Sequence, residues 1–364
     1  MSTRSLRSAG YSAAAAVLAV ALFAIFALLF SRLALASPAA LAATSSIKLT
    51  FTSGSLALVE QAAGANGSVS LELRRNGTYL FLVVTLPAGN YFAATSTPSG
   101  ANLTYSSASG PSSSNVATMT VTTLNVNQLT IDMGSGSASQ INLGALNASG
   151  KFGTVNLTSA GALTLTEVVA TAAVSASVGS IASGSALTNN VTAPRVQLSG
   201  TLGVGAVGNP LRTATPMMEM NTISGSIVVS NTGDLTLGIT TTNKFKGVQV
   251  GATSGDFIVD LRTSGTLSIT NKTETVLAPG NVTVTAGTGM VVACMTHYAD
   301  PKSMQSTGGT VVATSLAGDI KFGRFINPWK WFGDMSGAKG FTLLAPNGTI
   351  LVDTATYLES LGGP

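Results

Sequence analysis

The stretch Gly225-Ser-Ile-Val-Val-Ser-Asn-Thr-Gly233-Asp-Leu-Thr-Leu237 contains a short phrase from which the fold of this chain can be predicted. Twice within it, a glycine and a small polar residue precede an apolar–any–apolar alternation. Glycine tolerates the backbone angles of tight turns, and alternation with period two is typical of a strand that buries one face. The phrase therefore predicts a turn followed by a short strand.

The same phrase returns along the chain at a nearly regular interval. The interval from Gly225 to Gly247 equals the interval from Gly233 to Gly255. A repeating unit of this kind, about 20–25 residues long, is typical of a solenoid, whose coils bury their apolar faces against their neighbours. We therefore expect an all-β parallel solenoid of roughly nine coils. The phrases begin at Gly161, Gly225, Gly233, Gly255, Gly265, Gly280, Gly309 and Gly318.

The alternation also predicts which side chains face the interior. A slip of one residue would turn all of them outward, so the phase of each strand is a sharp prediction. The expected interior positions are Leu163, Leu165, Ile227, Val229, Leu235, Leu237, Phe257, Val259, Leu267, Ile269, Val282 and Val284.

Composition and charge agree with a folded, all-β chain. Only 9% of the 364 residues are charged, and the strong helix formers Glu, Lys, Arg and Gln are scarce. Beyond residue 36 there are 15 basic and 14 acidic residues, a net charge of +1. No basic stripe is left to follow a phosphate backbone, so we expect no nucleic-acid partner.

The N-terminus has the pattern of an export signal. Arg4 and Arg7 precede an apolar run over residues 13–30, and Ala34-Leu-Ala36 is a small-x-small cleavage pattern. The run is long for a signal peptide and approaches the length of a membrane span. Residues 1–36 are therefore a cleaved signal peptide or a retained signal-anchor, the only expected membrane contact. Either predicts a secreted or cell-surface (outer-envelope) protein.

The rest of the chain divides into three expected parts. Residues 37–115 form an N-terminal β region and linker, either a small β-sandwich or capping coils, with turn signals at Asn66-Gly67 and Asn76-Gly77. Residues 116–321 form the repeats. Residues 322–364 form a capping segment rich in aromatic residues, because an open solenoid end must be covered. Its aromatic patch is either a cap or a binding platform for sugars or a partner: Phe322, Arg324, Phe325, Trp329, Lys330, Trp331 and Phe332.

A longer stretch resembles a known group of surface proteins. Gly203-Val-Gly-Ala-Val-Gly-Asn-Pro-Leu-Arg-Thr213, followed by the phrases at Gly225 and Gly233, is similar to the coils of filamentous-haemagglutinin-type adhesins. The resemblance covers about residues 140–320. It implies a right-handed parallel β-helix and a surface or adhesive role. The secretion motif of that group, Asn-Pro-Asn-Gly-Ile, has its nearest match at Pro346-Asn-Gly-Thr-Ile350.

Motifs for catalysis or metal binding are scarce. The only cysteine and the only histidine, Cys294 and His297, have no further Cys or His to complete a metal site, and a single Cys forms no intramolecular disulfide. Asp234 and Asp256 are separated by the same interval as the glycines that precede them, so in coils of that length they would stack and could bind Ca²⁺ or share a proton. The alternative is that these aspartates are turn residues. We expect no catalytic residue, no metal and no cofactor.

Asn-x-Ser/Thr triplets are abundant, and in an exported chain they are candidate glycosylation sites. They begin at Asn66, Asn76, Asn102, Asn147, Asn156, Asn190, Asn271, Asn281 and Asn347.

Taken together, these features predict an exported, non-enzymatic rod for adhesion or surface assembly. Its expected partners are glycans or proteins of a host or neighbouring cell, or further copies of itself. Two alternatives remain open, a β-helix that binds or cleaves polysaccharides and a self-assembling envelope or filament subunit.

Overall fold

The computed structural model describes most of the chain from Ser45 to Ser360, with gaps at 53, 62–64, 77–78, 88, 94–96, 99–102, 107–114, 121–125, 148–149, 151, 187, 238–246, 270–275, 293–302, 323–333 and 353–356. Residues 44–364 form one compact unit. The expected leader, residues 1–36, lies outside the described residues.

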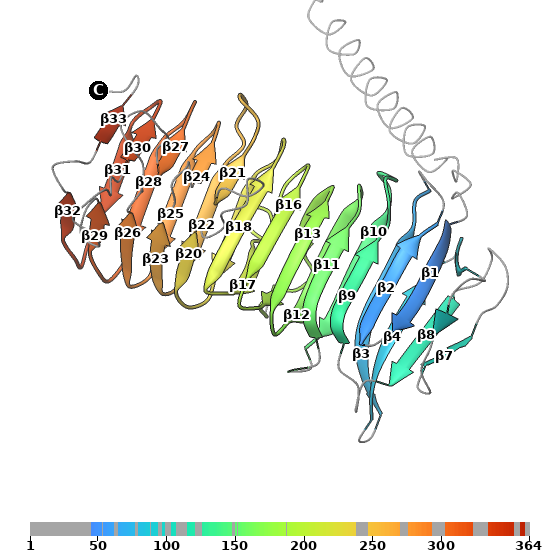
Figure 1. Ribbon diagram of the computed structural model, residues 1–364. Coiled ribbons are helices and arrows are strands. Elements are labelled where there is room, and N and C mark those ends of the chain that lie inside the picture. The colour runs from blue at the N-terminus through green and yellow to red at the C-terminus, as the bar shows by residue number, and fades with distance from the viewer. Residues whose placement is uncertain are drawn as a thin grey trace, which may run out of the picture. The chain divides into compact units, whose positions relative to one another are not determined.

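The described residues are all-β, and their strands form two long sheets (Figure 1). Sheet A contains β1 (Ser45–Thr52), β2 (Ser55–Glu60), β5 (Asn90–Phe92), β6 (Thr97–Pro98), β9 (Val126–Asp132), β11 (Phe152–Thr158), β13 (Ala173–Val178), β16 (Val196–Gly200), β18 (Met217–Thr222), β20 (Leu235–Leu237), β21 (Val248–Val250), β23 (Thr266–Ile269), β24 (Val276–Ala278), β26 (Gly289–Val292), β27 (Met304–Ser306), β29 (Ile320–Phe322), β30 (Asp334–Gly337), β32 (Ile350–Val352) and β33 (Tyr357–Ser360). Sheet B contains β3 (Ser68–Asn76), β4 (Tyr79–Leu86), β7 (Leu103–Ser106), β8 (Asn115–Thr120), β10 (Gln140–Leu146), β12 (Ala162–Val169), β14 (Ser180–Ser183), β15 (Val191–Thr192), β17 (Leu211–Ala214), β19 (Ile227–Asn231), β22 (Val259–Thr263), β25 (Val282–Ala286), β28 (Val311–Ser315) and β31 (Phe341–Leu344).

From β9 onward the chain is a parallel β-solenoid, as the glycine phrases predicted. It passes from sheet A to sheet B and back, and each strand pairs in parallel with its counterpart in the next coil. Figure 1 shows the coils stacked in chain order, from green to red. Gly233 has a φ of 90°, which fits the turn that the phrase predicted.

The interior of the solenoid is apolar, and the predicted phase of the strands is confirmed. Eleven of the twelve expected interior residues are at most 1% exposed. The exception is Phe257, which is only partly buried. There the strand begins later than the phrase suggested, at Val259, because Gly255 has a φ of 106° and prolongs the turn.

Asn231 is a polar residue of the interior with its hydrogen bonds satisfied. Its Oδ1 accepts hydrogen bonds from Thr213 Oγ1 at 2.9 Å and from the backbone N–H of Thr215 at 3.0 Å. Its Nδ2 donates to Thr263 Oγ1 in the next coil at 3.3 Å. Since buried polar groups are costly unless paired, this ladder holds three coils in register.

The coils are not of constant length. In sheet A, Val196 of β16 pairs with Met218 of β18, whereas Leu235 of β20 pairs with the more distant Leu267 of β23. The expected period therefore holds for only part of the stack. The additional residues of the longer coil lie between β20 and β21. These two short strands together pair with the single strand β18 of the preceding coil.

The N-terminal region is partly a coil and partly a cover for the end of the stack. Strands β2 and β3 pair in parallel with β9 and β10, so they form the first coil although Leu56 and its partner Leu129 are far apart in the chain. Strand β1 pairs antiparallel to β2, and β4 pairs antiparallel to β3 and β8. Of the two expectations for this region, capping coils describe it better than a separate sandwich.

Parallel pairing continues past the expected end of the repeats at residue 321. Strands β30 to β33 add further strands to both sheets, so described residues from 334 to 360 belong to the stack. Phe322, the first residue of the expected aromatic cap, is fully buried inside β29. The other six residues of that patch lie outside the described part.

Candidate functional site

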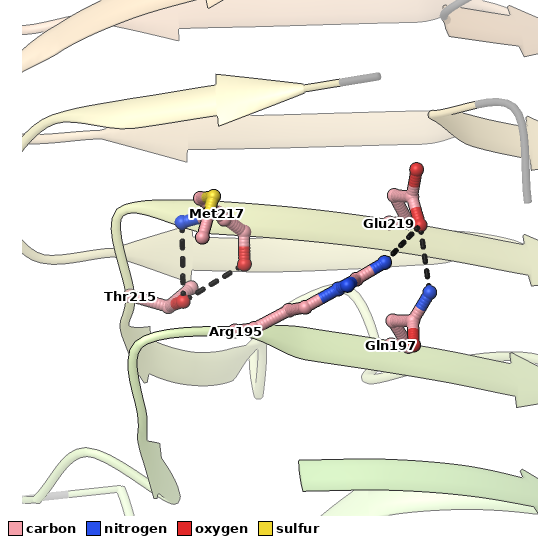
Figure 2. Close-up of polar contacts among 5 residues, drawn as sticks. All are labelled: Arg195, Gln197, Thr215, Met217 and Glu219. Carbon is pink, nitrogen blue, oxygen red and sulfur yellow. Dashed lines mark hydrogen bonds and ion pairs between the residues drawn. The ribbon is translucent and has the colours of Figure 1, made fainter. Parts of the chain in front are cut away.

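A buried carboxylate lies on the outer face of sheet A. Glu219 in β18 is 2% exposed, whereas its neighbours Met218 and Met220 point into the core. Gln197 Nε2 donates a hydrogen bond of 2.8 Å to Glu219 Oε2. Arg195 Nη2 lies 3.9 Å from the same oxygen, and Figure 2 shows both partners reaching it from the preceding coil. This pairing compensates the burial of the negative charge.

The same close-up shows how the chain enters β18. Thr215 Oγ1 accepts a hydrogen bond from the backbone N–H of Met217 and donates one to its carbonyl, at 3.3 and 2.8 Å (Figure 2). Such local side-chain bonds fix a turn. This turn leads directly into β18, where Glu219 points outward in register with Gln197 of the preceding coil.

Glu219 is the last member of an outward ladder on sheet A. Thr130, Asn156, Ser175, Gln197 and Glu219 follow one another in register from β9 to β18. In the next coil, Met218 pairs with Leu237 and Met220 with Val248. The whole segment 238–247 therefore replaces the single residue that would continue the ladder.

In each of the following four coils, the sheet A strand is divided into two short strands at this same ladder position. One column of parallel strands runs β20, β23, β26, β29, β32, and a second runs β21, β24, β27, β30, β33. We call the five segments between these columns the inserts, and their points of attachment the insert line. The inserts are residues 238–247, 270–275, 293–303, 323–333 and 353–356.

The sequence of the inserts differs from that of the scaffold. They contain both tryptophans, the only cysteine and the only histidine of the chain. Six basic and three acidic residues give them a net charge of +3, which leaves −2 for the rest of the chain beyond residue 36, since its total is +1. The charged residues are Lys244, Lys246, Lys272, Glu274, Asp300, Lys302, Arg324, Lys330 and Asp353.

The expected stacking of Asp234 and Asp256 is wrong. Asp234 precedes β20 in sheet A and Asp256 precedes β22 in sheet B, because the coil that begins at β20 is longer than the expected period. Asp234 Oδ1 instead accepts a 2.7 Å hydrogen bond from the backbone N–H of Thr266. Asp260 forms an ion pair of 2.7 Å with Arg262 on the same strand. Asp234 thus lies at a coil corner, as the alternative expected, but its side chain bonds the backbone of the next coil rather than local backbone.

A second carboxylate cluster lies at the first coil. Glu60 accepts hydrogen bonds from Ser45 Oγ and, at 2.9 Å, from the backbone N–H of Gly67. Partial burial raises the pKa of Glu60, and the negative charge of Asp132 in the next coil adds to this effect. The cluster joins β1, β2 and the loop before β3, so it couples the ionisation of Glu60 to the stability of the N-terminal end.

The candidate glycosylation sites differ in accessibility. Asn190 is fully buried, and its Nδ2 donates to two backbone carbonyls while its Oδ1 accepts from the backbone N–H of Arg212. The folded protein has no room for a glycan there. Asn156 is partly buried, the side chain of Asn76 is not described, and Asn102 and Asn271 lie outside the described residues. The exposed sites are Asn66, Asn147, Asn281 and Asn347.

Two residues that the sequence analysis considered as metal ligands lie in one of the inserts. Cys294 and His297 lie in residues 293–302, beyond the described part of the chain. Within the described residues, no group of three or more His, Cys, Asp or Glu side chains could hold a metal ion. No helix in that same part is long and apolar enough to cross a membrane.

Sequence reasoning missed Glu219 and the insert line. Glu219 interrupts the run Met217-Met-Glu-Met220, and one charge within an apolar run was the available signal. The insert line could have been found from the widening glycine interval toward the C-terminus.

Comparisons with protein-family models, with curated proteins and with solved structures found no significant match to this chain.

Proposed function

We propose that this protein is an exported, non-enzymatic surface protein whose solenoid presents the inserts to a binding partner. The partner class is the glycans or proteins of a neighbouring cell surface. Export rests on the basic-then-apolar leader and its Ala34-Leu-Ala36 pattern, and adhesion rests on the resemblance and on the insert line.

The insert line is the observation that carries the proposal. Loops on a rigid scaffold commonly carry binding residues, because they vary without disturbing the core. Five inserts begin and end at equivalent positions in consecutive coils, about 4.8 Å apart. They carry the aromatic and basic residue types that contribute most to binding hot spots, above all Trp329, Trp331 and Arg324.

A binding assay on the whole chain tests the adhesive role. Labelled protein is applied to a panel of immobilised glycans and extracellular proteins, beside a variant with Lys244→Ser, Lys246→Ser and Lys330→Ser. We expect saturable binding that weakens at least tenfold in the variant. A chain that binds nothing on the panel and cleaves a polysaccharide would overturn the proposal in favour of an enzyme.

Export has a test of its own. Protein recovered outside the cytoplasm is expected to begin at Ser37, after Ala36. An intact Met1 on membrane-bound protein would establish the signal-anchor alternative. Protein found only in the cytoplasm would contradict export.

A polysaccharide-binding role is the second candidate, and Trp329 and Trp331 favour it because both lie in one insert. Trp rings stack on sugars through their apolar faces. The double variant Trp329→Ala/Trp331→Ala separates a sugar partner from a protein partner, since it would abolish glycan binding and spare a protein partner held by the lysines.

A further inference from the structure

A carboxylate contacts the backbone amide of an Asn-Gly pair, Asn66-Gly67, directly before β3. The N–H of Gly67 donates a hydrogen bond of 2.9 Å to Glu60 Oε2. Ser45 Oγ donates to the other oxygen of the same carboxylate, Oε1. Both oxygens of Glu60 are therefore held in place. One of them lies at the peptide nitrogen that follows Asn66, and this nitrogen can close a five-membered ring on the side-chain amide carbon of Asn66.

The side-chain amide of Asn66 is also held by the protein. Its Oδ1 accepts a hydrogen bond of 3.1 Å from the backbone N–H of Ala138, in the turn between β9 and β10 of the next coil. An N–H aimed at a carbonyl oxygen stabilises the negative charge that develops there when the carbon is attacked. Asn66 is exposed, so ammonia can leave and water can enter.

Two glycines permit this close arrangement. A Cβ on Gly67 would collide with Glu60 Oε2, so only glycine lets the carboxylate reach this amide. A Cβ on Gly136 would collide with the carbonyl of the residue before Asn66 and would lie 2.8 Å from Asn66 Oδ1. The carbonyl of Gly67 accepts a 2.9 Å hydrogen bond from the N–H of Gln140. The reacting groups are therefore fixed from several sides, as proximity catalysis requires.

We propose that Asn66 is a self-modification site, at which Glu60 acts as general base for ring closure of the Asn66 side chain on the nitrogen of Gly67. The products are a succinimide and ammonia. Water then opens the ring to aspartate or isoaspartate. This inference does not depend on the adhesive function.

The reaction proceeds in three balanced steps. Glu60 Oε2 takes the N–H proton of Gly67 as the nitrogen forms a bond to Cγ of Asn66, and the carbonyl electron pair moves to Oδ1, where the N–H of Ala138 stabilises it. The pair then returns, the Cγ–Nδ2 bond breaks, and the acid form of Glu60 gives its proton to the departing ammonia. Water finally adds to either carbonyl of the ring and breaks one C–N bond.

The surroundings of Glu60 suit it to this role. A general base is most effective when its pKa lies near the working pH. Partial burial raises the pKa of Glu60, and the negative charge of Asp132 in β9 adds to this effect. Asp132 Oδ1 itself accepts a 3.0 Å hydrogen bond from the backbone N–H of Gly134, so it does not compete for Gly67.

Asn347-Gly348 is a natural reference within the same chain. Asn347 is exposed, as Asn66 is, and it also precedes a glycine. There the N–H of Gly348 donates to the backbone carbonyl of Ala345 at 3.2 Å, and Asn347 Nδ2 donates to the carbonyl of Leu316 at 2.8 Å. A carbonyl oxygen is a much weaker base than a carboxylate. Ring closure at Asn347 should therefore have no general base.

The experiment follows both asparagines in the full-length chain, produced in cells that do not N-glycosylate and held at neutral pH. Samples taken over time are digested at acidic pH. Mass spectrometry of the peptides then measures the fractions of asparagine, succinimide, aspartate and isoaspartate. Variant Glu60→Gln removes the base and keeps the size of the side chain. Control variant Glu72→Gln removes a carboxylate of β3 that pairs with Arg74. Circular dichroism verifies that each protein folds.

We expect Asn66 to convert faster than Asn347 in the wild type by roughly tenfold or more. Glu60→Gln should remove this difference by slowing Asn66 alone, and the control should behave as the wild type. The rate at Asn66 should level off as pH rises past the pKa of Glu60, whereas in Glu60→Gln it should keep rising. Equal rates at Asn66 in the wild type and folded Glu60→Gln would overturn the proposal, and so would equal slowing in Glu72→Gln.

A second measurement needs no variant. In urea the wild-type chain loses the contacts of Glu60 and Ala138 with this pair, so conversion of Asn66 should fall to the rate of Asn347. A faster conversion of Asn66 in the unfolded chain than in the folded one would show that the fold protects this pair, and would overturn the proposal.

Discussion

Asp234 Oδ1 accepts a hydrogen bond of 2.7 Å from the backbone N–H of Thr266, the residue in register with it in the next coil. The same contact recurs at 3.0 Å between Asn281 and Thr310 and between Asp319 and Thr349. In each case a Gly-Asx pair lies beneath a Gly-Thr pair. The acidic or amide side chain at the corner thus links successive coils.

The first prediction concerns this corner bond. Asp234→Ala should lower the free energy of unfolding by about 0.5–1 kcal/mol, since one inter-coil hydrogen bond is lost. Asp234→Asn keeps an acceptor oxygen and should cost less. Urea titration measures both, with the exposed Asp256→Ala as a control that should leave stability unchanged. Equal losses in the Ala and Asn variants would contradict the role of the acceptor.

The second prediction concerns the glycine above each corner. A Cβ at Gly309 would collide with Asn281 Oδ1 and with the backbone of Gly280, so Gly309→Ala should destabilise the protein by about 1–3 kcal/mol. Gly289→Ala is the matched control, because its Cβ would meet its neighbours only at ordinary contact distances. Thermal unfolding of both variants checks this, and equal melting temperatures would show that the corner can relax.

The third prediction tests the phase of the strands. Leu237 is fully buried, so Leu237→Asp should cost more than about 3 kcal/mol by placing an unpaired charge in the core. The adjacent Thr236 lies on the outer face, and Thr236→Asp should cost less than about 1 kcal/mol. Similar losses in the two variants would mean that the inside and outside faces are assigned wrongly.

Part of this architecture could be predicted from the sequence because its signal is local. The alternation after each glycine fixes which side chains point inward, and Leu163, Leu235 and Val284 are buried as predicted. The coil lengths could not be predicted from the same signal. A strand that breaks after Leu237 and resumes at Val248 has the same local pattern as two separate strands.

Long-range pairing explains what else was missed. The chain leaves the first coil after β3, forms the antiparallel cover, and returns at β9 beside β2. No local pattern links Leu56 to Leu129. The Glu219 cluster is equally non-local, because Arg195 and Gln197 reach Glu219 only when their coils are stacked.

The fourth prediction is a dependence of stability on pH. The pKa of Glu60 is raised in the folded state, so the folded state binds a proton more tightly than the unfolded state does. Its contribution is fully present below the unfolded pKa and is lost as pH rises through the folded pKa. Glu60→Gln should therefore melt higher than the wild type at pH 8, and this difference should shrink at pH 4. A difference that is constant or grows toward low pH would contradict the raised pKa.

The central claim is that the inserts bind a partner and the scaffold only positions them. The most direct measurement compares wild-type binding to the glycan and protein panel with that of a variant in which each insert is replaced by one threonine. Earlier coils carry a single residue at this ladder position, so the variant should fold. Shortening of the sheet B loop 205–210 is the control. We predict that only the first variant loses binding, with its strand content retained; undiminished binding without the inserts would contradict the claim.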